Sequence, residues 1–174
     1  MKVEKICQVA IVGAGYMAGE HIRAFQDIPG VNISGIHSRT RVRAEQIAAQ
    51  FGIVKVCGSI EELYHLTEAD LVVVTVPELE MNGVSRACFK YPWVALLEKP
   101  AGYNYADARE IESAARAEHR RVFVALNRRH YSSTQVVIKD LRELSGPRFI
   151  RVEDQEDQIR ALEAGQPRLV VDNW

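Results

Sequence analysis

Short apolar runs alternate along the chain with segments whose apolar residues recur at helical spacing. The apolar runs predict strands at residues 7–12, 31–37, 54–57, 71–76, 93–97 and 122–126. Most are apolar without interruption, as expected of strands that helices cover on both faces. Met17, Ile22 and Phe25 recur at helical spacing after the first run, and Ala44, Ile47 and Ala48 do so after the second. The alternation predicts an α/β protein with a doubly wound parallel sheet.

The pattern changes after Gly146-Pro147, where residues 148–153 alternate between polar and apolar side chains. Such alternation predicts a half-exposed strand with one wet face. We therefore expect a boundary near residue 146. Residues 1–146 form the first domain in this interpretation, and residues 147–174 hold the first strand or strands of an incomplete second domain.

Composition and charge exclude several classes of protein. Hydrophobic residues make up 47% of the chain and charged residues 26%, the balance of a soluble globular protein. A net charge of -1 gives no field that would attract nucleic acid or anionic lipid. The apolar run 9–12 is too short for a signal peptide or a membrane span, so we expect a cytoplasmic protein. Three widely separated cysteines favour neither a disulfide framework nor a metal site.

A glycine-rich turn follows the first predicted strand and precedes the first predicted helix. Its residues are Gly13, Ala14, Gly15, Tyr16, Met17 and Ala18. Gly13 permits a tight turn, Gly15 lets backbone amides approach a diphosphate, and the small Ala18 permits close packing of helix on sheet. This context favours a dinucleotide-binding Rossmann fold over an ordinary strand-turn-helix corner. We expect Gly13→Val to block the cofactor while leaving the sheet folded.

The end of the second predicted strand carries basic and hydroxyl side chains where an acid would bind the ribose of NAD. Ser38 and Arg39 suit a 2'-phosphate, and Arg43 adds charge one helical turn later. We therefore expect NADP as the preferred cofactor, with NAD as the other possibility. In the alternative interpretation Ser38 or Thr40 caps the next helix and the arginines are solvated.

Further motifs resemble the glucose-fructose oxidoreductase, inositol dehydrogenase and MocA family (Gfo/Idh/MocA). They are Glu98-Lys99-Pro100 after the fifth strand, Thr75-Val76-Pro77 after the fourth, and Asn127-Arg128-Arg129 after the sixth. The resemblance implies that Lys99 contacts the substrate hydroxyl and assists proton transfer, and that Pro100 is often cis. It also implies that Glu98 helps place the cofactor and that Thr75, Val76, Pro77 and Asn127 line its nicotinamide end. The Asn and His that many members carry after the fourth strand are absent here.

The position of Lys99 also favours a catalytic role, because the strand ends of a doubly wound sheet converge on the ligand crevice. A positively charged nicotinamide nearby would lower the pKa of a lysine toward values useful for acid-base catalysis. The alternative is a solvated surface lysine. Arg128, Arg129 and His130 are candidate substrate contacts, and the two arginines could instead pair with acids. We expect the other histidines, including His21, to face solvent.

These features predict an NAD(P)-dependent dehydrogenase or reductase. The resemblance implies hydride transfer to or from a sugar, nucleotide sugar or cyclitol, in a full-length protein that is a homo-oligomer. It also implies that residues 147–174 are the start of an α+β substrate domain. The partner of Lys99 would lie beyond residue 174, so we expect this chain alone to be inactive. A non-catalytic module that senses nucleotides is the alternative.

Overall fold

The computed structural model describes residues 5–147 together with residues 149, 151, 159 and 163. The contacts within the chain divide it into two compact units, Met1–Ala125 and Leu126–Trp174. The first unit contains the sheet, and the second contains the segment that follows the last strand.

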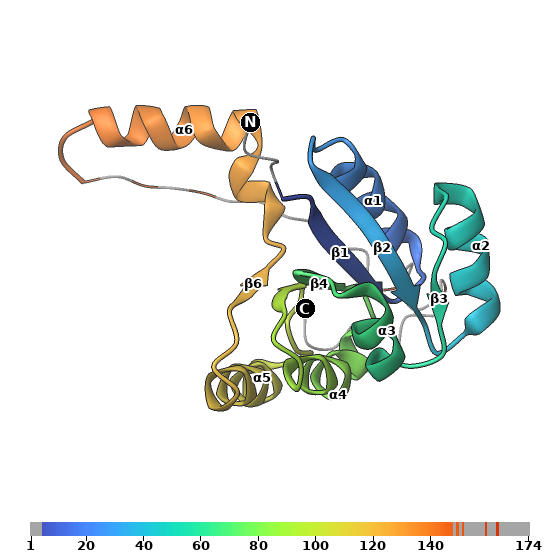
Figure 1. Ribbon diagram of the computed structural model, residues 1–174. Helices are drawn as coiled ribbons and strands as arrows, with labels where there is room; N and C mark the ends of the chain where they lie inside the picture. Colours follow the sequence, from blue (N-terminus) through green and yellow to red (C-terminus); the bar gives the residue numbers. More distant parts are fainter. Residues whose placement is uncertain (1–4, 148, 150, 152–158, 160–162, 164–174) are drawn as a thin grey trace. The chain divides into compact units, whose positions relative to one another are not determined.

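Six parallel strands form one sheet in the order β3-β2-β1-β4-β5-β6 (Figure 1). Their bounds are β1 Cys7–Val12, β2 Val31–His37, β3 Val56–Cys57, β4 Leu71–Val74, β5 Val94–Leu97 and β6 Val122–Val124. The order reverses at β1, since β2 and β4 flank it on opposite sides. The predicted doubly wound parallel sheet is confirmed.

Helices cover the sheet from both sides (Figure 1). On one face α1 (Tyr16–Gln26) and α2 (Arg41–Phe51) bury Ile22 and Ala44 against the odd-numbered β1 residues. On the other face α3 (Ile60–Thr67), α4 (Glu78–Phe89) and α5 (Tyr105–Ala117) pack on the even-numbered ones. Alternate side chains of one strand thus enter two cores, which explains the uninterrupted apolar runs.

Polar side chains fix where helices begin. Ser59 Oγ accepts from the amide of Glu62 at 3.0 Å, and Asn104 Oδ1 accepts from the amide of Asp107 at 2.9 Å. Ser59 and Asn104 are therefore the N-caps of α3 and α5. The Glu62 carboxylate accepts from the amide of Gly58, one residue earlier than the reciprocal bond of a capping box.

Four strands are shorter than the apolar pattern predicts: β5 by one residue, and β3, β4 and β6 by two. Pairing of β3 with β2 covers Val56 and Cys57 only, and Val54 is 93% exposed at the edge of the sheet. The ladder of β4 ends at Val74, although the amide of Thr75 still donates to Val12 O. Edge position and the turn toward α4 override the local propensity at these ends.

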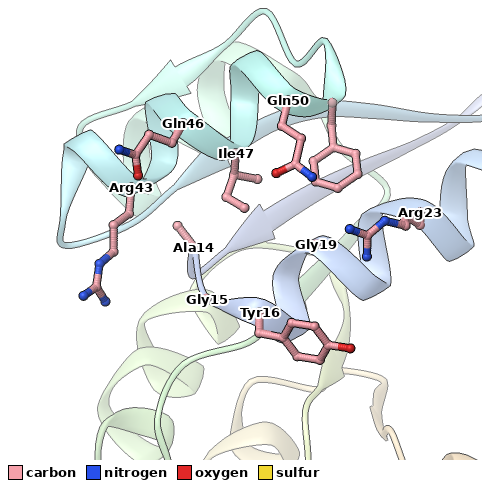
Figure 2. A pocket seen from close by; sticks show the side chains of 10 residues that line it. Ala14, Gly15, Tyr16, Gly19, Arg23, Arg43, Gln46, Ile47 and Gln50 are labelled. Atoms are coloured by element: carbon pink, nitrogen blue, oxygen red, sulfur yellow. The ribbon is translucent and has the colours of Figure 1, made fainter.

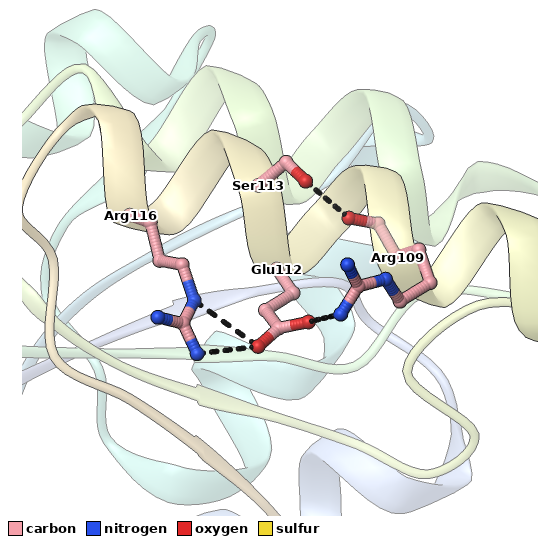
Figure 3. Close-up of polar contacts among 4 residues, drawn as sticks. All are labelled: Arg109, Glu112, Ser113 and Arg116. Atoms are coloured by element: carbon pink, nitrogen blue, oxygen red, sulfur yellow. Dashed lines mark hydrogen bonds and ion pairs between the residues drawn. The ribbon is translucent and has the colours of Figure 1, made fainter.

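The outer side of α5 carries a solvated charge network (Figure 3). Glu112 accepts from Arg109, three residues earlier, and from Arg116, four residues later, at distances of 2.7 to 3.1 Å. Hydrogen bonds from Arg116 lower the pKa of the Glu112 carboxyl. Pairs at these spacings on an exposed helix contribute only weakly to its stability.

The second unit contains a 3₁₀ turn, η1 (Asn127–His130), and α6 (Ser132–Glu143). The predicted boundary near residue 146 lies within this unit and stays a prediction. The strand expected over residues 148–153 rests largely on positions outside the described residues.

Candidate functional site: a crevice at the carboxyl ends of the strands

Backbone hydrogen bonds align the carboxyl ends of five neighbouring strands. The amide that follows each strand donates to the last carbonyl of its neighbour at 2.8 or 2.9 Å. The pairs are Gly13 to His37, Thr75 to Val12, Glu98 to Val74, and Ala125 to Leu97. The residues directly after β1, β4 and β5 therefore lie in one row, about 4.8 Å apart from strand to strand. This row places the glycine-rich turn, Thr75 and Lys99 along a single edge of the sheet.

The two glycines of the turn have different surroundings. Gly13 has a φ of +113°, and a Cβ built on it would lie 2.5 Å from the carbonyl oxygen of Thr75. Gly15 has a φ of -95°, and a Cβ built there would have no neighbour within 4 Å. Gly13 is thus required by packing of the β1 and β4 ends, whereas Gly15 borders open space. The expectation that Gly13→Val leaves the sheet undisturbed is corrected for this reason: the substitution should strain the turn and destabilise the sheet.

The first turns of α1 and α2 lack the groups that usually satisfy helix amides. Neither helix has a side-chain N-cap hydrogen bond or an acidic residue in its first turn. Each of α3, α4 and α5 has an acid in that turn, and α3 and α5 also have side-chain caps. Free amides and an uncompensated helix dipole attract anions. The start of α6 (Ser132–Glu143) also lacks both groups, so α1 and α2 are those helix ends of this kind at which the sequence also predicts a phosphate.

A hollow of about 460 Å³ lies between α1 and α2. At one end it reaches Ala14, Gly15 and Tyr16, and farther along it is lined by Arg23, Arg43, Gln46 and Gln50. Figure 2 shows Arg43 and Tyr16 extending on either side of the Ala14-Gly15 segment. Thr75, Pro77 and Lys99 are not among its lining residues. The hollow therefore touches the predicted cofactor site at the glycine-rich turn and at Arg43, and does not extend to the residues after β4 and β5.

The predicted 2'-phosphate ligands lie in the loop between β2 and α2. Ser38 Oγ accepts from the amide of Thr40 at 3.3 Å, and neither Ser38 nor Thr40 caps α2 through its side chain. Arg39 pairs through Nη1 with Glu80 Oε1 at 2.8 Å. Its side chain is 81% exposed. Arg39 is thus accessible to a ligand, but an acid of α4 already binds it.

Lys99 lies on the surface directly after the buried Glu98, and the Lys99-Pro100 peptide bond is cis. The cis bond agrees with what the family resemblance implies. Glu98 is 7% exposed, and its Oε2 accepts from His21 Nε2 at 2.7 Å. The side chain of His21 is only 15% exposed, so the expectation that it faces solvent is wrong. This hydrogen bond joins α1 to the residue before Lys99.

The remaining candidates belong to the second unit. Asn127, Arg128, Arg129 and His130 form η1, and all four are exposed. Arg129 Nε donates to Leu126 O at 3.0 Å. A role for these residues in cofactor or substrate binding stays a prediction.

Metal and thiol chemistry find no support in the described part of the chain. No cluster of three His, Cys, Asp or Glu there could hold a metal ion. The cysteines are free, and burial raises the pKa of the Cys88 thiol to about 12, which leaves it protonated and inert. No helix among the described residues is long and apolar enough to cross a membrane.

Two side chains at the crevice were missed in the sequence. His21 follows the small buried Ala18 by three residues and precedes the buried Ile22, so helical spacing places it beside the core. Glu80 could not be recognised without the strand order. That order brings the loops after β2 and β4 to either side of the β1 turn.

Family comparison identifies the class of protein that this fold and crevice define. Residues 7–126 match the model of the GFO_IDH_MocA family, described as an oxidoreductase family with an NAD-binding Rossmann fold. The chain belongs to this family of oxidoreductases, as its motifs predict.

Individual relatives match part of their length. Trans-1,2-dihydrobenzene-1,2-diol dehydrogenase of Mus musculus is 28% identical over 110 residues, which cover 62% of this chain and 33% of that enzyme. The WlbA dehydrogenase of Chromobacterium violaceum, solved with NADH and UDP-GlcNAcA, has a TM-score of 0.74 at 20% identity, covering 81% of this chain and 41% of that one. Biliverdin reductase of Synechocystis, solved with biliverdin and NADP+, has a TM-score of 0.67 at 20% identity, covering 82% and 45%. The chain spans about a third of the length of the curated relatives it matches.

Proposed function

We propose that this chain is the cofactor-binding part of an NAD(P)-dependent oxidoreductase acting on a hydroxyl or carbonyl group of a sugar, nucleotide sugar or cyclitol. The observation that carries the proposal is the row of strand ends, which brings the glycine-rich turn and Lys99 to one edge of the sheet. The substrate class rests on the family and on relatives such as the WlbA dehydrogenase solved with UDP-GlcNAcA. The substrate wall of the crevice belongs, in this proposal, to a domain that begins near residue 146.

The turn fits a dinucleotide diphosphate. The open space at Gly15 would admit a phosphate to the amides of the first α1 turn, where the chain supplies no competing acid. Gly13 holds the turn against Thr75, so the amides keep a fixed direction. Ala14, Tyr16, Met17 and Ala18 complete the turn. Thr75, Val76, Pro77 and Glu98 would follow the cofactor toward Lys99, and Asn127 is a further proposed cofactor contact.

Lys99 would transfer the proton in this reaction. A bound nicotinamide accepts or donates a hydride at its C4 carbon. When a carbinol is oxidised, its carbon loses a hydride and its hydroxyl loses a proton, and neutral Lys99 Nζ would accept that proton. In the reverse direction the ammonium of Lys99 would return the proton to the carbonyl oxygen. Arg128, Arg129 and His130 would bind the polar groups of the substrate.

We further propose a preference for NADP, with NAD as the second cofactor. Ser38 and Arg39 stand where an acid would bind the ribose of NAD, and Arg43 lies in the first turn of α2. The uncapped α2 terminus adds to the attraction of a 2'-phosphate. For the whole protein we propose a cytoplasmic homo-oligomer.

Calorimetric titration of the chain with NADPH and NADH tests the proposal. We expect one saturable site for each cofactor, with NADPH bound more tightly. Arg39→Ala should weaken NADPH binding by about tenfold or more, the loss of a charge-assisted hydrogen bond, and leave NADH nearly unchanged. Absence of binding by either cofactor would refute the assignment of the site.

A further inference from the structure

We propose that Glu80 sets the cofactor selectivity of this protein by competing with the 2'-phosphate of NADP for Arg39. The inference rests on the proposed dinucleotide site and concerns a residue outside it. Glu80 belongs to α4 and Arg39 to the loop after β2, so the two residues are contributed by different strand ends.

The strand order determines where the ion pair of Arg39 with Glu80 lies. The sheet runs β2-β1-β4, so the loops that follow β2 and β4 lie on either side of the glycine-rich turn of β1. The ion pair of Arg39 Nη1 with Glu80 Oε1, at 2.8 Å, therefore joins the segments that follow the two strands flanking β1. In a doubly wound sheet a dinucleotide enters at this reversal of strand order. An NADP phosphate that reaches Arg39 meets a guanidinium that already has an anionic partner.

The position of Glu80 in α4 holds its carboxylate at this place. Its amide donates to Pro77 O at 2.9 Å, which puts Glu80 in the first helical turn. An acid there is favoured by the helix dipole. Both partners are exposed, with side-chain exposures of 81% for Arg39 and 47% for Glu80, so a ligand can replace the carboxylate without unfolding α4. NADH lacks the 2'-phosphate and would leave the ion pair intact.

Competition predicts a selective change in affinity. An exposed ion pair contributes little, so Glu80→Gln should tighten NADPH binding by about two- to fivefold. NADH affinity should change by less than about 1.5-fold, because nothing in NADH requires Arg39 to leave Glu80. The quantity to measure is the dissociation constant of NADH divided by that of NADPH, since this ratio cancels effects common to both cofactors.

Glu78→Gln is a matched control. Glu78 is the other glutamate in the first turn of α4, so its substitution removes the same charge and the same interaction with the helix dipole. It is not the acid that pairs with Arg39. If Glu78→Gln raises the ratio as much as Glu80→Gln does, the loss of one negative charge from the first turn of α4 accounts for the effect, and the inference is wrong.

A double-mutant cycle with Arg39→Ala shows whether Glu80 acts on the cofactor through Arg39. Competition for Arg39 predicts that Glu80→Gln no longer improves NADPH binding once the guanidinium is removed. An equal improvement in both backgrounds would mean direct repulsion of the phosphate, which overturns the competition. If wild type binds both cofactors and Glu80→Gln leaves the ratio unchanged, the inference fails while the dinucleotide site stands. If wild type binds neither, the proposed function fails and the inference with it.

Discussion

The two glycines of the β1 turn provide the sharpest separation of folding from cofactor binding. We consider alanine at each position, which adds one methyl group in both cases. At Gly13 that methyl group would meet the carbonyl oxygen of Thr75 at 2.5 Å and its Oγ1 at 2.6 Å, on a residue with a φ of +113°. At Gly15 it would point into open space from a residue with a φ of -95°. The same substitution should therefore destabilise the fold at Gly13 and weaken cofactor binding at Gly15.

Magnitudes follow from these surroundings. A disfavoured φ costs about 1–3 kcal/mol, and overpacking against backbone costs about as much again. Gly13→Ala should thus lower the free energy of unfolding by about 2–6 kcal/mol, a large share of a typical 5–15 kcal/mol. Gly15→Ala should leave that free energy within about 0.5 kcal/mol. Its methyl group would instead keep the diphosphate from the amides of α1, weakening NADH and NADPH alike by about tenfold or more.

Thermal unfolding followed by circular dichroism measures the first effect, and calorimetric titration measures the second. At about 2–4 °C per kcal/mol for a chain of this size, Gly13→Ala should lower Tm by roughly 5–20 °C. A Gly15→Ala protein that binds both cofactors as wild type does would refute the diphosphate site. A Gly13→Ala protein with the wild-type Tm would refute the packing argument at the β1 and β4 ends.

Three further predictions concern the pairs around the sheet and the catalytic candidate. His21→Leu should lower the free energy of unfolding by about 1–3 kcal/mol in denaturant titrations, because it leaves the buried Glu98 carboxylate without its donor; Glu98→Gln in the same background should recover part of that loss, and no recovery would contradict the reasoning. The hydrogen bond from the Lys5 ammonium lowers the pKa of Asp70, so this pair stabilises the fold at pH values above the unfolded pKa of about 3.9, and its contribution is lost as the pH falls through the lowered pKa. The free energy of unfolding of Asp70→Asn should therefore fall less than that of wild type between neutral pH and a pH below the lowered pKa; an equal fall in both proteins would show that this pair does not cause it. Lys99→Ala should leave ADP-ribose affinity unchanged, because that fragment ends before the nicotinamide; a large loss measured by titration would place Lys99 elsewhere in the site.

The regular part of the fold could be predicted because the apolar pattern and the helix-capping residues indicate the same strands and helices. Uninterrupted apolar runs such as Leu71 to Val74 belong to strands buried on both faces, and Ser59 and Asn104 start helices where their side chains can cap them. Strand ends were less predictable, because Val54 is as apolar as a buried strand residue yet lies exposed at the sheet edge.

The candidate site could be predicted only where its chemistry is local. The glycine-rich turn is contiguous in sequence, and so are Lys99 and the cis Pro100 after β5. Glu80 and Arg39 are 41 positions apart and meet through the order of β2, β1 and β4, which no local pattern contains. His21 and Glu98 are 77 positions apart and meet for the same reason. The contacts that tune a crevice between strands depend on topology, whereas the groups that line it depend on motifs.

A crystal structure of the chain soaked with NADP+ tests the central claim most directly. We predict that the diphosphate lies against the amides at Gly15 and the first turn of α1, and that the nicotinamide end extends along the row of strand ends toward Lys99. The 2'-phosphate should lie beside Arg39. Cofactor bound instead within the hollow between α1 and α2, away from Thr75 and Lys99, would contradict the account.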